Sequence, residues 1–151
     1  MTTISSNLQA VKRRIIGACS AAGRDPASVT LLAVSKTFPA AALREAHAAG
    51  QQCFGENYVQ EALAKQTALA DLGLEWHFIG PLQSNKTRPV AEHFAWVHSV
   101  ERLKIAERLS AQRPAGLPPL NVCVQVNVSS EESKSGCTPA EAPALCRAVA
   151  R

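Results

Sequence analysis

Apolar residues recur along this chain at two spacings, and each spacing predicts a different element. Between residues 5 and 22 they fall three or four positions apart, as on one face of a helix: Leu8, Val11, Ile15, Cys19. Between residues 120 and 128 they fall at every second position, which is the period of a strand: Val122, Val124, Val126, Val128. Shorter apolar runs predict four more strands, at 30–36, 52–56, 75–80 and 96–100.

Helices are predicted between these strands, at 39–49, 58–73, 88–93 and 102–111. A last helix is predicted after a capping box formed by Thr138 and Glu141, with Pro139 in its first turn. One helix followed by five strand–helix units, with no hairpin signal, predicts a parallel α/β sheet in a single domain over 1–151. Periodicity alone leaves two architectures open, a doubly wound sheet and a (β/α)8 barrel.

The composition agrees with helices packed on a parallel sheet. Apolar residues make up 46% of the 151 residues but aromatic residues only 5%, so the core must be aliphatic and rich in alanine. The net charge is +4, yet the basic residues are scattered and no aromatic residues lie among them as a base-stacking platform requires. A small anionic ligand is therefore a better expectation than a nucleic acid.

Cysteine and histidine spacing predicts no metal site. The five cysteines include no CxxC pair, and the four histidines show no paired-ligand motif. An odd number of widely spaced cysteines is typical of a reducing cytosol. The first residues lack the apolar centre of a signal peptide, and no apolar run reaches transmembrane length. We expect a cytoplasmic protein without a membrane partner.

Lys36 is the first candidate for chemistry. It ends the run 31–35, which we expect to be a strand buried on both faces. At the carboxyl end of such a strand, a lysine amine reaches the crevice where α/β proteins bind ligands. A desolvated amine in that position can form a Schiff base with an aldehyde. The alternative is a lysine whose stem packs while its ammonium group reaches water.

Polar residues follow other strands too: Asn57, Ser84, Asn85, Lys86, Lys134. Asn57, Ser84 and Asn85 are explained equally well as helix caps. The three residues from Ser84 to Lys86 are also suited to binding an anion at a helix N-terminus. No GxGxxG, GxSxG or P-loop motif is present, which disfavours dinucleotide, hydrolase and nucleotide sites.

Three segments resemble the family of pyridoxal phosphate homeostasis proteins: 33–37 (AVSKT), 54–61 (FGENYVQE) and 76–86 (WHFIGPLQSNK). The resemblance extends over essentially the whole chain, and 133–136 (SKSG) also fits. It implies the barrel of alanine racemase, a (β/α)8 TIM-barrel type that is incomplete here, with about five βα units. It also implies pyridoxal 5′-phosphate (PLP) as cofactor, held as a Schiff base on Lys36.

The resemblance implies roles for three more residues. Asn57 is expected in the cofactor pocket. His77 is either a hydrogen-bonded core histidine or a residue inside the barrel near the cofactor ring. Lys134 is expected at the mouth of the pocket, where the alanine racemase barrel has an arginine, or else as a solvated loop lysine.

The function that the resemblance implies is intracellular PLP homeostasis, by binding without established turnover. PLP-dependent apoenzymes would then be partners. The alternative is a PLP-dependent amino-acid racemase, which needs a second base facing Lys36.

The length of the chain gives a further expectation. A (β/α)8 domain typically has about 250 residues, so we expect a shortened family member that lacks the last three βα units. The full-length protein is expected to be a monomer. The short chain is expected to self-associate and to bind PLP more weakly, because phosphate loops usually follow strands seven and eight.

Overall fold

The computed structural model describes residues 2–151. Its helices are α1 (Thr3–Ala21), α2 (Ala40–Ala48), α3 (Val59–Ala68), α4 (Thr87–His93), α5 (Leu103–Gln112) and α6 (Ala142–Val149). Its strands are β1 (Ala33–Val34), β2 (Cys53–Glu56), β3 (Glu75–Phe78), β4 (Trp96–Val100) and β5 (Asn121–Val124). Short 3-10 helices cover Pro26–Ser28, Ala70–Leu72 and Ser84–Lys86.

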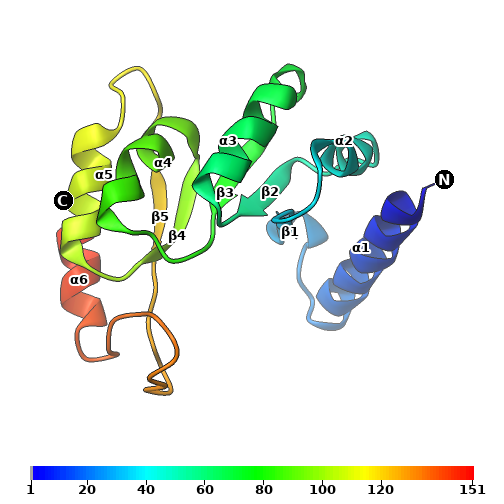
Figure 1. Cartoon of the computed structure of the whole chain (residues 1–151). Coiled ribbons are helices and arrows are strands. Elements are labelled where there is room, and N and C mark those ends of the chain that lie inside the picture. The colour runs from blue at the N-terminus through cyan, green and yellow to red at the C-terminus, as the bar shows by residue number, and fades with distance from the viewer. Residues whose placement is uncertain (1) are drawn as a thin grey trace.

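The five strands form one parallel sheet in the order β1-β2-β3-β4-β5, as Figure 1 shows. Neighbours in the chain are thus neighbours in the sheet, and the order never reverses. A doubly wound sheet reverses at a switch point, whereas a barrel does not. The architecture is therefore a segment of a (β/α) barrel, and the predicted parallel α/β fold is confirmed.

The core lies between the helices and one face of the sheet. Alternation along the strands directs Phe54, Trp76, Phe78 and Val97 into this layer, where they are buried against helix residues such as Leu43. The intervening residues lie on the opposite face, which we call the inner face of the sheet. Among residues 2–151, no helix is long and apolar enough to cross a membrane.

The first strand corrects a sequence expectation. Only Ala33 and Val34 form β1, and Val34 is 51% exposed, so the run 30–36 is not a strand buried on both faces. β1 pairs only with β2, and it lies at the edge of the sheet. Its inner face therefore has no second layer over it in the described part of the chain.

Two boundaries near the carboxyl end were also predicted wrongly. β5 ends at Val124 because the next residues pair with their own loop: Cys137 N–H donates to the Gln125 carbonyl, and Asn127 N–H donates to the Cys137 carbonyl. Helix α6 begins at Ala142 instead of near Pro139. Half of the predicted capping box forms at the turn before that helix: the Glu141 N–H donates to Thr138 Oγ1, while the Glu141 carboxylate accepts from the Thr138 hydroxyl instead of its backbone N–H.

Candidate functional site

Lys36 lies in a tight turn directly after β1. The turn spans Ser35–Phe38 and is closed by a hydrogen bond of 3.1 Å from the Phe38 N–H to the Ser35 carbonyl. Thr37 has a φ of 69°, as the third residue of a type II turn requires. Thr is unusual in this left-handed region, which favours glycine. Lys36 itself is exposed, so its amine is open to a ligand from solution.

A buried ion pair between Lys65 and Glu56 contacts the first residue of this turn, Ser35. The Lys65 amine, on α3, lies 2.9 Å from Glu56 Oε1, and the two side chains are 6% and 0% exposed. The same amine donates to the Ser35 carbonyl at 2.8 Å. Ser35 Oγ in turn donates to Glu56 Oε2 at 2.6 Å. The residue before Lys36 is therefore fixed through both its side chain and its carbonyl group.

Glu61 completes the network on the other side of Lys36. Its Oε1 atom accepts hydrogen bonds from Lys65 Nζ at 2.7 Å and from the Thr37 N–H at 2.6 Å. The hydrogen bond from Lys65, and to a lesser degree that from Thr37, lowers the pKa of Glu61, although partial burial opposes the shift. A carboxylate thus supports the left-handed residue of the turn. The backbone on both sides of Lys36 is bound to side chains of α3.

Asn57 follows β2, the strand next to β1, so it lies at the same edge of the sheet as the Lys36 turn. Its Oδ1 atom is buried and has no hydrogen-bond partner among the described residues. Gly80 packs against it so closely that a Cβ atom there would lie 2.6 Å from Asn57 Cβ. Buried polar atoms are normally paired, so this amide oxygen has capacity to bind a ligand.

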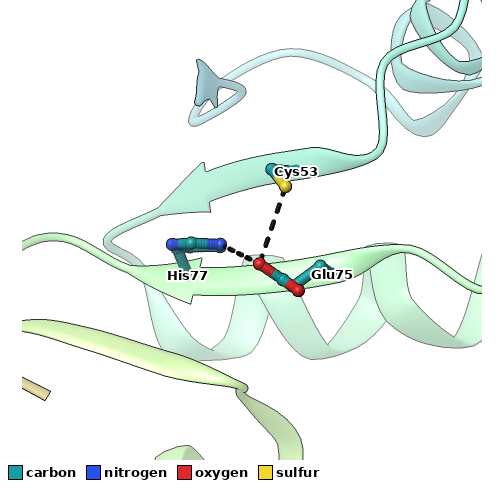
Figure 2. A group of neighbouring side chains, drawn as sticks. All are labelled: Cys53, Glu75 and His77. Carbon is teal, nitrogen blue, oxygen red and sulfur yellow. Dashed lines mark hydrogen bonds and ion pairs between the residues drawn. The ribbon is translucent and has the colours of Figure 1, made fainter. Parts of the chain in front are cut away.

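His77 is buried on the inner face and belongs to a polar cluster on β3. Its Nε2 atom lies 2.7 Å from Glu75 Oε1, and its Nδ1 atom lies 2.8 Å from His98 Nε2. Its ring stacks on that of Trp96 at a centroid distance of 5.6 Å. Burial and the neighbouring His77 lower the pKa of His98. Figure 2 shows Cys53 and His77 converging on the same Glu75 carboxylate.

In the register of the sheet, His77 lies closer to the amino ends of the strands than Lys36 does. Gly55 pairs with Val34 on one side and with His77 on the other. His77 is therefore level with Val34, two residues before Lys36, which corresponds to about 7 Å along a strand. Its hydrogen bonds fit the interpretation as a core histidine. A position near the cofactor ring remains a prediction.

Lys134 is not brought close to Lys36 along the sheet. It is exposed in the loop after β5, and β5 and β1 form opposite edges of the sheet. Four strand spacings of about 4.8 Å separate the two edges along the sheet. Ser84, Asn85 and Lys86 form a separate short helix after β3, and the Ser84 carbonyl accepts a hydrogen bond from Arg108. Lys86 and Asn57 line one surface pocket of about 420 Å³.

Sequence reasoning missed the network that holds the turn. Glu56 and Glu61 lie within the segment 54–61 and Lys65 lies beyond it, and none of the three is a predicted site residue. One signal was available: Lys65 lies four residues after Glu61 on a predicted helix, so the two side chains share a face. The contact with Glu56 depends on how α3 packs on β2, which spacing along the chain does not give.

Comparisons with known proteins agree with this geometry. The chain is 73% identical over 149 residues to the pyridoxal phosphate homeostasis protein of Pseudomonas aeruginosa, covering 99% of this chain and 65% of that protein. It is 58% identical over 153 residues to the protein of the same name from Escherichia coli K12, with coverages of 99% and 65%. The chain thus spans about 65% of the length of these relatives.

Solved structures share the fold. The PLP-bound structure of PipY from Synechococcus elongatus PCC7942 superposes with a TM-score of 0.75 at 44% identity, covering 95% of this chain and 64% of that one. A protein of unknown function from Bifidobacterium adolescentis gives a TM-score of 0.85 at 34% identity, with coverages of 97% and 63%.

A family profile matches nearly the whole chain. The profile of the alanine racemase N-terminal domain matches residues 4–151. The match covers all five of the sequential parallel strands. This chain therefore belongs to the alanine racemase N-terminal domain family.

Proposed function

We propose that this chain binds PLP covalently through Lys36 and serves PLP homeostasis without turning over a substrate. The observation that carries the proposal is the fixed turn around Lys36, whose flanking backbone is bound by Lys65 and Glu61. The names of the bacterial relatives and the PLP-bound PipY structure support it. PLP supplies an aldehyde that reacts with amines and a phosphate that can be held non-covalently.

The residues after β1 and β2 fit such a group. Lys36 offers an exposed amine on a backbone that does not have to reorganise. In its neutral form this amine adds to the aldehyde carbon and one water molecule leaves, so that a C=N bond replaces C=O. Asn57 offers a buried amide oxygen without a partner, and we propose that it orients the ring. We propose that His77 forms the floor of the same pocket and that Lys134 forms its mouth, which the loop after β5 would have to reach from the opposite edge of the sheet.

The proposal also covers the domain organisation, the cellular compartment and the partners of the protein. The described residues form one core, which supports a single PLP-binding domain over 1–151. All five cysteines are free, which supports a reducing compartment such as the cytoplasm. We propose that PLP-dependent apoenzymes receive the bound cofactor.

Reductive trapping tests the site. The chain is incubated with PLP, reduced with borohydride and digested, and the labelled peptide is identified by mass spectrometry. We expect the label on Lys36, and we expect Lys36→Ala to lose it while Lys86→Ala and Lys134→Ala keep it. Because Lys36 is exposed, Lys36→Ala should change the free energy of unfolding by less than about 0.5 kcal/mol. Label mainly on Lys86 or Lys134 would overturn the assignment.

A racemisation assay then tests the absence of turnover. The chain, loaded with PLP and incubated with single enantiomers of amino acids, should leave them unchanged. Sustained racemisation that disappears in Lys36→Ala would contradict the proposal and favour a racemase. Transfer of PLP to an apoenzyme, followed by recovery of that enzyme's activity, tests the delivery role.

A further inference from the structure

Three donor side chains meet on the inner face of the sheet: Cys53, Glu75 and His77. Cys53 and Glu75 lie further from Lys36 along the sheet than His77 does. Cys53 on β2 pairs directly with Glu75 on β3, and His77 lies two residues further along β3 on the same face. Their donor atoms all lie within 4.8 Å of one another. Figure 2 shows the thiol and the imidazole directed at the same carboxylate oxygen.

The distances suit a small dication. Cys53 Sγ lies 3.6 Å from Glu75 Oε1, and His77 Nε2 lies 2.7 Å from the same oxygen. Zinc bonds of about 2.0 Å to nitrogen and oxygen and about 2.3 Å to sulfur place tetrahedral donors about 3.3–3.6 Å apart. The sulfur–oxygen pair already has this spacing. The nitrogen–oxygen pair must open by about 0.6 Å, which the half-exposed Glu75 side chain allows.

The chemistry of the donors selects among metals. Thiolate, imidazole and carboxylate together are typical of zinc and cobalt, whereas magnesium and calcium require mainly oxygen ligands. A thiolate and a carboxylate together neutralise one dication. Three protein ligands leave one tetrahedral position for water.

His98 orients the imidazole ligand. A histidine that binds a metal usually donates its other ring N–H to a fixed acceptor. His77 Nδ1 lies 2.8 Å from His98 Nε2, which accepts a hydrogen bond from the Nδ1–H when His77 Nε2 binds the metal.

We infer that Cys53, Glu75 and His77 form a binding site for a zinc-class divalent cation on the inner face of the sheet. The inference does not rest on PLP binding, because it is argued from the positions of the three donor atoms alone; only His77 is shared with the pocket proposed for PLP. Spacing along the sequence gave no sign of the site. Its ligands come from two strands, and only the pairing of Cys53 with Glu75 brings them together.

Cobalt titration tests the site. The reduced, metal-free chain is titrated with Co²⁺, and absorbance reports thiolate–cobalt charge transfer. We expect a band that saturates at one Co²⁺ per chain and is displaced by Zn²⁺. Cys53→Ser should abolish the band, and Glu75→Gln should weaken binding at least tenfold.

Matched cysteine variants provide the control. Cys123 is also half-buried, but it lies on β5, and Cys146 is exposed on α6. Cys123→Ser and Cys146→Ser should keep the band and bind within twofold of the unchanged chain. Circular dichroism of each variant verifies the fold. Absence of the band at stoichiometric Co²⁺, or its loss in Cys123→Ser with retention in Cys53→Ser, would overturn the inference.

Discussion

At the scale of single residues, the turn after β1 combines an unfavourable conformation with strong local support. Thr37 has a φ of 69°, where a side chain with a branched Cβ is rarely found. The Glu61 carboxylate accepts its N–H, and Lys65 binds the carbonyl of Ser35 at the start of the same turn. Lys36 is therefore presented by a backbone that the free chain would rarely adopt.

Gly80 provides a test of how tightly Asn57 is held. A Cβ at Gly80 would lie 2.6 Å from Asn57 Cβ and 3.4 Å from Asn57 Cα. We expect Gly80→Ala to lower the free energy of unfolding by about 1–3 kcal/mol, because overpacking displaces Asn57. It should also slow PLP labelling of Lys36 if Asn57 orients the ring. Urea unfolding and borohydride trapping measure the two effects.

Gly17 is the matched control for this substitution. It lies within α1 and has no atom within 4 Å of the position of a Cβ. Gly17→Ala should raise the free energy of unfolding by up to about 1 kcal/mol through helix propensity. Equal stability of Gly80→Ala and the unchanged chain would show that Asn57 moves freely.

At the scale of elements, helix α3 ties β1 to β2. Glu61 and Lys65 lie one turn apart on the helix, and Glu61 bonds the turn after β1 through the Thr37 N–H. Lys65 meets Glu56 of β2 and the carbonyl after β1, so one amine contacts both strands. The pairing of the short strand β1 with β2 depends on these contacts with α3 as well as on the backbone hydrogen bonds between the two strands.

The pH dependence of the free energy of unfolding should reveal the contribution of the ionised Glu61 carboxylate. Its pKa is lowered in the folded chain, so its contribution is present above the unfolded pKa of about 4.3 and is lost as the pH falls through the folded pKa. Glu61→Gln should therefore destabilise the chain at pH 7, and the difference should shrink as the pH falls below about 4. Urea unfolding between pH 7 and pH 3 measures it.

Glu107→Gln is the control for that series. Glu107 is exposed on α5 and makes no hydrogen bond or ion pair within residues 2–151. Its substitution should leave stability within about 0.5 kcal/mol at neutral pH. A Glu61→Gln difference that stays constant down to pH 3 would contradict a role for the ionised carboxylate.

Among substitutions in α3, removal of the Lys65 amine should lower the free energy of unfolding the most. Lys65→Met leaves Glu56, whose side chain is 0% exposed, as a buried charge without its partner. A loss of about 3–5 kcal/mol is typical of such a change. Lys104→Met, at an exposed position of α5, should change stability by less than about 0.5 kcal/mol. Thermal and urea unfolding of both variants would reveal whether the pair is structural.

At the scale of the molecule, the sheet has two open edges in residues 2–151. β1 and β5 each pair with one neighbour only. Two large apolar side chains near these edges are exposed, Val34 at 51% and Val128 at 76%. Open strand edges beside apolar surface promote association between chains.

We predict that the chain self-associates through these edges. We expect light scattering to give an apparent mass that rises with protein concentration. A charge on an edge strand opposes pairing, so Val34→Lys should reduce the association. A chain that stays monomeric at high concentration would show that the edges are protected by their short length.

The sequence predicted the course of the chain better than its contacts. All five strands were predicted close to where they occur, four as short apolar runs and the fifth by its alternating valines. The lengths of β1 and β5 were overestimated, since an edge strand and a loop that pairs with its own base depend on distant partners. Lys36 was identifiable from its place after a strand. The network beneath it and the cluster on Glu75 require the register between strands.

The buried pair of Glu56 and Lys65 also limits how this protein can change over generations. Loss of Lys65 leaves the fully buried Glu56 carboxylate without its cationic partner, so a first substitution at position 65 is strongly destabilising. Only a simultaneous exchange for two apolar side chains of similar volume would preserve the packing. Such an exchange would still release the carbonyl of Ser35 from its bond. In a library of double variants, we therefore expect residues 56 and 65 to tolerate substitution only together. Both bind Ser35, the residue before Lys36.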